Sequence, residues 1–99
     1  MNEKLLVVIA RVKAKPGKEI EVMNHLKSLV EPSRKDAGCV NYDLHRNQDE
    51  PGSFLFHETW HSREHLERHL AKPDLQAALA KLGPLVAVTP EIGLWEKIL

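Results

Sequence analysis

Apolar and polar residues follow two different periods along this chain, and the period changes at short turn signals. Residues 5–12 form an apolar run rich in valine and isoleucine, which favours a buried β-strand. The Lys-Pro-Gly sequence at 15–17 is a turn signal. From there, apolar side chains recur at helical spacing and predict a helix that Pro32 ends or kinks, before Gly38 closes the connection.

Two further strands follow, with a loop between them. Residues 39–46 alternate between the two faces of a strand, with apolar side chains on one face and polar side chains on the other. Residues 48–52 (Gln-Asp-Glu-Pro-Gly) have the composition of a hairpin-type loop. Residues 53–60 then predict a third strand, which ends at a tryptophan.

The last third of the chain predicts two short helices and a final strand. Residues 62–70 begin at a serine suited to the N-cap position and predict a helix. A proline then opens a second helical stretch over 73–82, which a Gly-Pro pair ends. Residues 85–98 contain the last strand, which we expect to be interrupted near Pro90 and Gly93.

The order β-α-β-β-α-(α)-β predicts an α+β fold, a ferredoxin-like split β-α-β sandwich, in one domain over residues 1–99. In this topology the helices cover only one face of the sheet. The first strand is nevertheless apolar on both faces, and the third has Phe54 and Phe56 on one face and Leu55 on the other. A sheet that is apolar on both faces needs a cover on both, so we expect a homodimer with the sheets packed face to face.

Charge and composition exclude several classes of protein. Fourteen basic residues balance fourteen acidic ones, and neither sign gathers into the basic stripe that nucleic-acid binding needs. The longest purely apolar run, residues 5–10, is too short for a membrane span or a signal-peptide core. The single cysteine, Cys39, excludes an internal disulfide and suits a reducing compartment. We therefore expect a cytoplasmic protein that binds neither nucleic acid nor membranes.

The sequence carries no cofactor motif. It has no glycine-rich phosphate loop, no cysteine pair and no Gly-x-Ser-x-Gly elbow. His61, Glu64 and His65 spell His-x-x-Glu-His, a zinc signature of some peptidases. However, Ser62 is the expected helix cap, so His61 lies off the helix, and the chain is too short to surround a peptide. We expect neither a metal nor an organic cofactor.

Candidate chemistry gathers where the third strand turns into the next helix. Glu58 and Trp60 end the strand, and His69 shares a helix face with apolar neighbours, so its imidazole should point toward the core. A carboxylate on an apolar strand needs a partner, for which His69 and Arg63 are the nearest candidates. A His–Glu pair in an apolar site can act as a general base. The structural alternatives are a core histidine and a structural ion pair.

Trp60, Tyr42 and Asn41 are candidates for binding a substrate. Trp60 and Tyr42 could wall a cleft for a flat aromatic molecule, with the tyrosine hydroxyl holding a polar edge. Core packing is the alternative for both aromatic residues. Asn41 lies on the strand face opposite Tyr42, where it could donate a hydrogen bond to a substrate or occupy a dimer interface or a solvent position.

Two strings of residues resemble the antibiotic biosynthesis monooxygenase family, in particular its small bacterial quinol monooxygenases: Gly38-Cys39-x-x-Tyr42 and Glu58-x-Trp60-x-Ser62-x-x-x-Leu66-x-x-His69-Leu70-x-x-Pro73. The resemblance covers essentially the whole domain and implies a dimeric α/β barrel. Several members of the family oxidise polycyclic phenols or quinols with molecular oxygen, using neither metal nor flavin. By position, Glu58, Trp60 and His69 match the shared motif, and Tyr42 matches an aromatic residue near the pocket.

Two departures from the family pattern bear on the activity. Many relatives carry a histidine after the motif proline, where this chain has Asp74, so any proton transfer that depends on that histidine is lost or altered here. Haem-degrading members use an asparagine, a tryptophan and a haem-ligating histidine at positions that align with Ala10, His69 and Leu79. Because no ligand stands near Leu79, the resemblance does not extend to haem degradation.

The residues and the resemblance together predict a cofactor-independent monooxygenase. His69, oriented by Glu58, would remove a proton from a small aromatic quinol or polyphenol in an apolar pocket, with molecular oxygen as co-substrate. The first alternative is an isomerase of the same fold that enolises a small keto signal molecule without oxygen. The second is a non-catalytic dimeric module that binds a small hydrophobic molecule or serves in a stress response.

Overall fold

A four-stranded antiparallel sheet and a layer of helices make up the protein. The computed structural model describes residues 4–99. The elements, in chain order, are β1 (Leu6–Lys13), α1 (Glu19–Lys27), α2 (Val30–Arg34), β2 (Cys39–Arg46), β3 (Ser53–Trp60), α3 (Arg63–Leu70), α4 (Pro73–Leu82), the 3-10 turn η1 (Gly83–Leu85) and β4 (Glu91–Glu96). The strand order is β2-β3-β1-β4, with every neighbouring pair antiparallel. The predicted ferredoxin-like α+β fold is confirmed.

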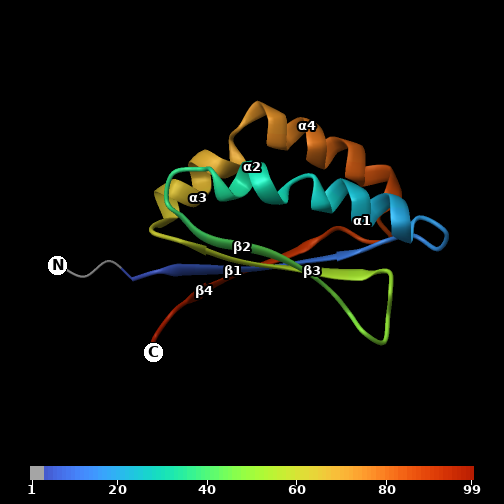
Figure 1. Cartoon of the computed structure of the whole chain (residues 1–99), viewed down its shortest axis with the longest axis horizontal. Helices are drawn as coiled ribbons and strands as arrows, with labels where there is room; N and C mark the ends of the chain where they lie inside the picture. Colours follow the sequence, from blue (N-terminus) through green and yellow to red (C-terminus); the bar gives the residue numbers. More distant parts are fainter. Residues whose placement is uncertain (1–3) are drawn as a thin grey trace.

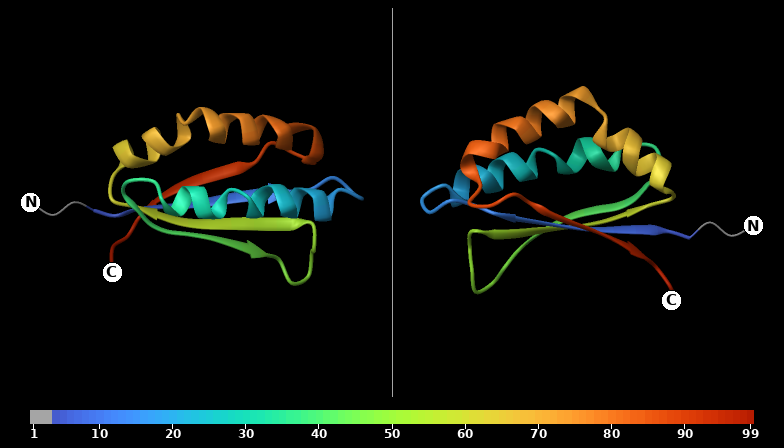
Figure 2. Two further views of the ribbon diagram at one scale, coloured as in Figure 1. Left: turned by 45° about the horizontal axis from the view of Figure 1, so that its top comes forward. Right: turned by 180° about the vertical axis from the view of Figure 1, so that it is seen from behind.

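The helices all lie on one face of the sheet, as Figures 1 and 2 show. The core fills the space between the two layers. Its completely buried side chains are Trp60 from β3 and Val22 and Leu26 from α1. None of the helices within residues 4–99 is long and apolar enough to cross a membrane.

The predicted helix after the first turn divides into α1 and α2. Pro32 has no backbone N–H and its ring crowds the carbonyl four residues earlier, that of Ser28, so α1 and α2 do not join into one regular helix. The chain tightens there instead: the Ser28 hydroxyl donates to the carbonyl of His25 at 2.6 Å. Leu29 N–H donates to the carbonyl of Leu26 at 3.1 Å.

Strand β4 begins directly after Pro90 but runs without a break through Gly93, which pairs with Ile9. The expected interruption at Gly93 is therefore wrong. A side chain at this position would stand 2.9 Å from the indole nitrogen of Trp95, the next residue on the same face. Glycine is needed here to make room for the Trp95 ring, so it does not mark a strand end.

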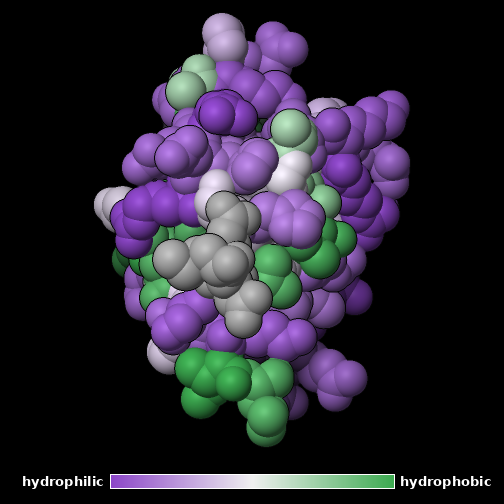
Figure 3. All heavy atoms as spheres, turned by 90° about the vertical axis from the view of Figure 1, so that its left-hand side faces the viewer, coloured by the Kyte–Doolittle hydropathy of each residue, from purple (hydrophilic) through white to green (hydrophobic). Residues whose placement is uncertain are grey.

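The second face of the sheet carries no helix within residues 4–99. Val7, Ile9 and Leu55 are only half-buried on this open face, and Trp95 is 61% exposed. Figure 3 shows a further apolar group at the bottom of the molecule, at the level where the C-terminus emerges in Figure 1. The open face is what the homodimer prediction requires, and the dimer itself stays a prediction.

Candidate functional site

Glu58, Trp60 and His69 meet between the sheet and the helices, as the sequence predicts. All three side chains are buried. The rings of Trp60 and His69 lie 4.6 Å apart and are tilted by 36°. The indole N–H of Trp60 donates to Glu58 Oε1 at 3.0 Å. Strand β3 supplies the acid and the indole two residues apart on one face, and α3 brings the imidazole down onto them.

The partner of His69 is Asp36, and the predicted His69–Glu58 pair is wrong. His69 Nδ1 lies 2.7 Å from Asp36 Oδ2, whereas the Glu58 carboxylate is held by Trp60. Asp36 belongs to the turn between α2 and β2. No local pattern marks this acid, because 33 positions separate it from His69.

Lys72 completes the cluster from the turn between α3 and α4. Its ammonium group donates to Asp36 Oδ1 at 2.6 Å, so the carboxylate bridges Lys72 and His69. The side chains of His69, Asp36 and Lys72 are 3%, 14% and 39% exposed, respectively. The three groups therefore form a line from the core to the surface, which we call the His69–Asp36–Lys72 line.

Burial and charge fix the protonation states along this line. Burial alone would raise the pKa of Asp36, but the hydrogen bonds from Lys72 and His69 outweigh it and leave the pKa below its usual value. Burial lowers the pKa of His69, with the charge of Lys72 acting in the same direction and Asp36 opposing both. An ionised carboxylate only accepts hydrogen bonds, so Nδ1 carries the proton of a neutral imidazole. Nε2, which has no hydrogen-bond partner among residues 4–99, is left with a free lone pair.

Glu58 is the second perturbed acid of the site. Burial raises its pKa to about 7, against the opposing effect of the hydrogen bond from Trp60. Glu58 therefore gains and loses its proton near neutral pH. Its hydrogen-bond partner is Trp60 and not His69. Its contact with Trp60 fixes the orientation of the indole that lies against the imidazole.

Tyr42 also packs against the imidazole. Its ring centroid lies 5.7 Å from that of His69 in an edge-on arrangement and 4.9 Å from that of Phe56. Burial, together with the charge of Glu58, raises the pKa of the Tyr42 phenol far above its usual value, so the hydroxyl stays protonated. Tyr42 and Trp60 thus both pack against the His69 ring.

Asn41 lies on the open face of the sheet, away from this cluster. Its amide donates to Asp43 Oδ2 and to the carbonyl of His57, both at 3.0 Å. The strand alternation that places Tyr42 beside His69 points Asn41 the other way. Asn41 is therefore not part of the site that His69 forms.

A cavity of about 200 Å³ opens beside His69, between the helices. Its apolar wall consists of Leu29, Pro32, Leu75 and Ala78. The His69–Asp36–Lys72 line and Asp74 supply the ionisable groups. Trp60 and Tyr42 do not line this cavity, so the prediction that they wall the cleft is wrong. They pack against His69 from the core side and support it.

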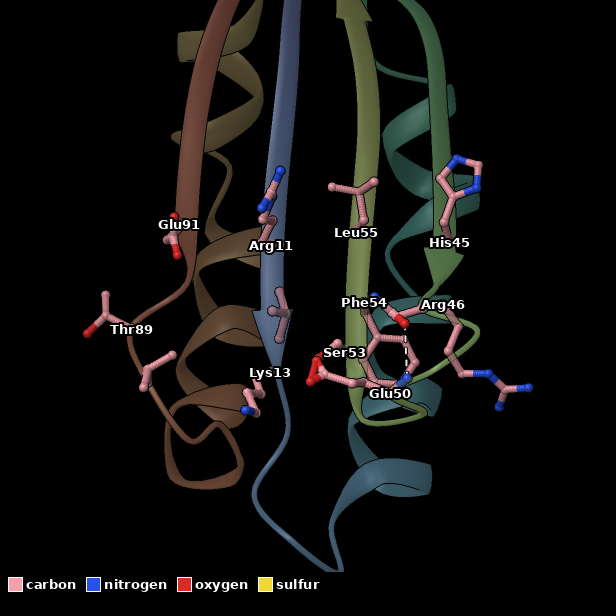
Figure 4. A pocket seen from close by; sticks show the side chains of 13 residues that line it. Arg11, Lys13, His45, Arg46, Glu50, Ser53, Phe54, Leu55, Thr89 and Glu91 are labelled. Atoms are coloured by element: carbon pink, nitrogen blue, oxygen red, sulfur yellow. Dashed lines mark hydrogen bonds between the residues drawn. The ribbon is translucent and has the colours of Figure 1, made fainter.

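A larger hollow of about 470 Å³ lies on the open face of the sheet. Figure 4 shows its side chains spread over neighbouring strands, among them Arg11, Lys13 and His45. These three side chains are all exposed. Active sites favour buried titratable groups with shifted pKa values, which only the smaller cavity offers. The smaller cavity is therefore the candidate active site.

Close packing of Gly38 against α3 holds Asp36 in place. Gly38 has a φ of 82°, and a side chain there would overlap the imidazole of His65. His65 is fixed in turn by the Ser62 hydroxyl, which lies 2.7 Å from its Nδ1 and also caps α3. His65 thus packs against Gly38, in the loop that carries Asp36. His69, one helical turn later, reaches the Asp36 carboxylate.

The His-x-x-Glu-His motif of residues 61–65 contributes to this packing through His65. His65 is engaged by Ser62, and the rings of His61 and His65 lie 6.3 Å apart. Within residues 4–99, no three His, Cys, Asp or Glu side chains gather as a group that could hold a metal ion.

A family model described as antibiotic biosynthesis monooxygenase matches residues 5–81. The chain belongs to the antibiotic biosynthesis monooxygenase family. The match confirms the resemblance that the two motifs indicate, and it supports a monooxygenase-type role. The matched region includes Asp36, His69 and Lys72, although the motifs themselves mark only His69.

Similar proteins come from diverse organisms. "Uncharacterized protein sll1783" of Synechocystis is 33% identical over 91 residues, which are 92% of this chain and 62% of that protein. This chain therefore spans less than two thirds of that relative. "Putative monooxygenase YcnE" of Bacillus subtilis is 31% identical over 88 residues, 89% of this chain and 93% of the relative. The crystal structure of PA3566 from Pseudomonas aeruginosa matches with a TM-score of 0.91 at 29% sequence identity. The match covers 97% of this chain and 96% of the PA3566 chain.

Proposed function

We propose that this protein is a cofactor-independent monooxygenase that oxidises a small aromatic quinol with molecular oxygen, and that His69 is its general base. Membership of the monooxygenase family supports the reaction class. The observation that carries the proposal is the state of His69. This neutral, buried imidazole has Nδ1 committed to Asp36 and Nε2 unbonded, and it lines a partly apolar cavity.

The reaction begins with removal of the phenolic proton by His69 Nε2. Asp36 holds the tautomer that makes this nitrogen the acceptor, and it stabilises the imidazolium that forms. The resulting phenolate gives one electron to oxygen, and the radical pair combines to form a carbon–oxygen bond at a ring C–H position. Protonation by the imidazolium gives a hydroperoxide. Loss of water then leaves one oxygen atom in a hydroxylated quinone, so quinol plus oxygen gives product plus one water.

The cavity suits small substrates. A volume of about 200 Å³ lies below the usual range for drug-sized ligands, roughly 300–1,000 Å³, and above the roughly 150 Å³ of a cavity known to hold benzene. A substrate with one ring, or two compact rings, fits this size better than the polycyclic phenols of larger enzymes. Its ring would lie on the apolar wall, with its hydroxyl beside His69.

The test is an aerobic screen of benzoquinols and naphthoquinols in an oxygen electrode, corrected for autoxidation without protein. We expect wild type to consume one molecule of oxygen per quinol. His69→Gln is expected to lose about 10²–10⁴-fold of the rate, as removal of a general base does. His45→Gln, which changes an exposed histidine on the open face, is the matched control.

Three outcomes would contradict the proposal. Equal oxygen uptake by wild type and His69→Gln would remove His69 from the chemistry. Turnover of a keto compound at the same rate without oxygen would point to the isomerase reaction, for which the same base would serve. Binding of quinols without any turnover would leave a non-catalytic binding module.

The homodimer and the cytoplasmic location also stay proposals. The uncovered apolar residues on the open face support a second copy of the chain as its partner. The candidate cavity lies among the helices, on the other side of the sheet from this face. Pairing through the open face would therefore leave the cavity accessible.

A further inference from the structure

Lys72 has a place in the site that the proposed reaction does not assign to it. We propose that Lys72 is a positioning residue for His69: by sharing the Asp36 carboxylate, it keeps the imidazole neutral and oriented with Nε2 as its free nitrogen. The kinetic part of this inference rests on the proposed function. The electrostatic part is a property of the folded protein alone.

The geometry places Lys72 and His69 on one carboxylate. The two residues flank the turn between α3 and α4, where Lys72 N–H donates to the carbonyl of His69 at 3.3 Å. Their side chains then converge on Asp36, with His69 Nδ1 at 2.7 Å from Oδ2 and Lys72 Nζ at 2.6 Å from Oδ1. Each carboxylate oxygen therefore receives one of the two donors.

The positive charge of Lys72 compensates the negative charge of Asp36, and this affects the protonation of His69. A lone carboxylate against an imidazole favours the imidazolium form, which has no lone pair with which to accept a proton. Lys72 balances the charge of Asp36, so the line is neutral as a whole while His69 is neutral. When His69 accepts a proton from a phenol, the line gains one positive charge beside the new phenolate.

Other ionisable groups face His69 from each neighbouring element. Strand β2 contributes Tyr42, β3 contributes Glu58, and α4 contributes Asp74 at the cavity wall. All of these are neutral or acidic groups. Among the residues described, Lys72 is the one lysine or arginine that lines the cavity. Its removal therefore leaves the negative charges around His69 without an opposing cation.

A histidine titration by NMR tests this directly. We expect Lys72→Met to raise the pKa of His69 by about 1, the lower end of the effect of one close charge. Lys72→Arg should restore the wild-type value, and Asp36→Asn should shift it in the opposite direction. Lys81→Met removes the same charge from an exposed position on α4 and should change nothing. Loss of one signal in His69→Gln assigns the resonance.

Several results would overturn the inference. It fails if the pKa of His69 in Lys72→Met is unchanged or lower, or if Lys72→Arg behaves like Lys72→Met. If Lys72→Met does not fold, the Lys72→Arg and Asp36→Asn titrations decide: the inference fails if Asp36→Asn leaves the pKa of His69 in place.

The pH profile of oxygen uptake supplies the kinetic readout. We expect the acidic limb of kcat/KM in Lys72→Met to move to higher pH, with about a tenfold loss below the limb and recovery above it. A merely structural ion pair would lower the rate equally at every pH, and that result counts against the inference. If wild type oxidises no quinol, the proposed function fails while the NMR titration still decides the role of Lys72.

Discussion

At the residue scale, the site has two acids with different tasks: Glu58 is buried, and the side chain of Asp36 is 14% exposed. Asp36 stays ionised because it receives hydrogen bonds from Lys72 and His69. Glu58 has only the Trp60 indole, and burial raises its pKa to about 7. The difference follows from surroundings alone: two donors, one of them a cation, against one neutral donor. Asp36 therefore suits the support of a base, and Glu58 suits the support of an aromatic ring.

Because Asp36 supports the base and Glu58 supports Trp60, we expect substitution of Asp36 to lower activity more than substitution of Glu58. Asp36→Asn removes the acceptor charge that fixes the His69 tautomer, so we expect a loss of about 10²-fold or more in kcat/KM. Glu58→Gln keeps an acceptor for Trp60 and is expected to lose less than about tenfold. Oxygen uptake by the two variants measures the order. A larger loss in Glu58→Gln than in Asp36→Asn would restore the His69–Glu58 pair that the sequence favours.

Glu58 also predicts how stability depends on pH. Its pKa is 4.5 in an unfolded chain and about 7 in the folded protein, so between these values the folded state binds more protons than the unfolded state. The contribution of Glu58 to the free energy of unfolding therefore falls as pH rises through about 7. Glu58→Gln does not ionise, so we expect it to exceed wild type in stability by about 2 kcal/mol at about pH 8 and by much less at about pH 5.

Urea unfolding at the two pH values measures this difference. Glu64→Gln, a change of the same kind at an exposed position on α3, is the control for the loss of one charge. An effect of Glu58→Gln that is the same at both pH values would contradict a buried carboxyl group with a raised pKa.

The sequence predicts part of this site and misses the rest for a physical reason. His69 can be found because its spacing with apolar neighbours turns it toward the core. Glu58 can be found because an acid on an apolar strand stands out. Asp36 and Lys72 carry no such signal, since both look like solvated loop residues. Their role depends on which loop meets which helix, and local periodicity does not encode that.

At the element scale, the join between α3 and the α2–β2 turn controls the site. Gly38 and Gly17 both have a positive φ, of 82° and 84°. Only Gly38 packs against another element, since Gly17 has nothing within 4 Å of the position its side chain would take. Substituting Gly17 therefore tests the cost of the backbone conformation alone, whereas substituting Gly38 adds the cost of a steric clash.

We expect Gly17→Ala to lower the free energy of unfolding by about 1 kcal/mol, the cost of a left-handed conformation for a residue with a side chain. Gly38→Ala should lose about 2–4 kcal/mol, because it also pushes His65 and α3 away from the turn. Urea unfolding measures both variants. Equal losses would show that α3 does not rest on Gly38. Activity should fall in Gly38→Ala alone, since only that change displaces Asp36.

Element boundaries were predictable where the chain marks them with turn residues. Strands β2 and β3 occupy the predicted residues 39–46 and 53–60, because loop-forming residues bound both. The predicted break at Gly93 fails because a glycine also serves where a neighbouring ring needs room. That need arises from Trp95 on the same strand face, and composition alone does not distinguish the two uses.

At the scale of the whole molecule, the two faces of the sheet have different surroundings. One face packs on the helices and supports the cavity, while the other is left open. The apolar residues on both faces of β1 predict this difference from the sequence alone. The sequence cannot supply the cavity itself, because its volume depends on how closely α2, α3 and α4 approach one another.

The open face predicts the oligomeric state. We expect wild type to have about twice the 11.3 kDa mass of one chain by light scattering. Trp95→Glu places a charge on the open face and should shift the mass toward one chain. Ile20→Glu, which changes an exposed apolar residue on α1, is the control and should stay dimeric. A monomeric wild type would contradict the homodimer while leaving the account of the cavity intact.

We propose that His69, held by Asp36, delivers a deprotonated quinol to oxygen in the cavity between the helices. Mass spectrometry of the product formed under isotopically heavy oxygen gas tests it most directly, with wild type and His69→Gln compared side by side. We expect one heavy oxygen atom in each product molecule made by wild type, and almost no product from His69→Gln. A product that forms without the heavy atom, or at equal rates in both proteins, would contradict it.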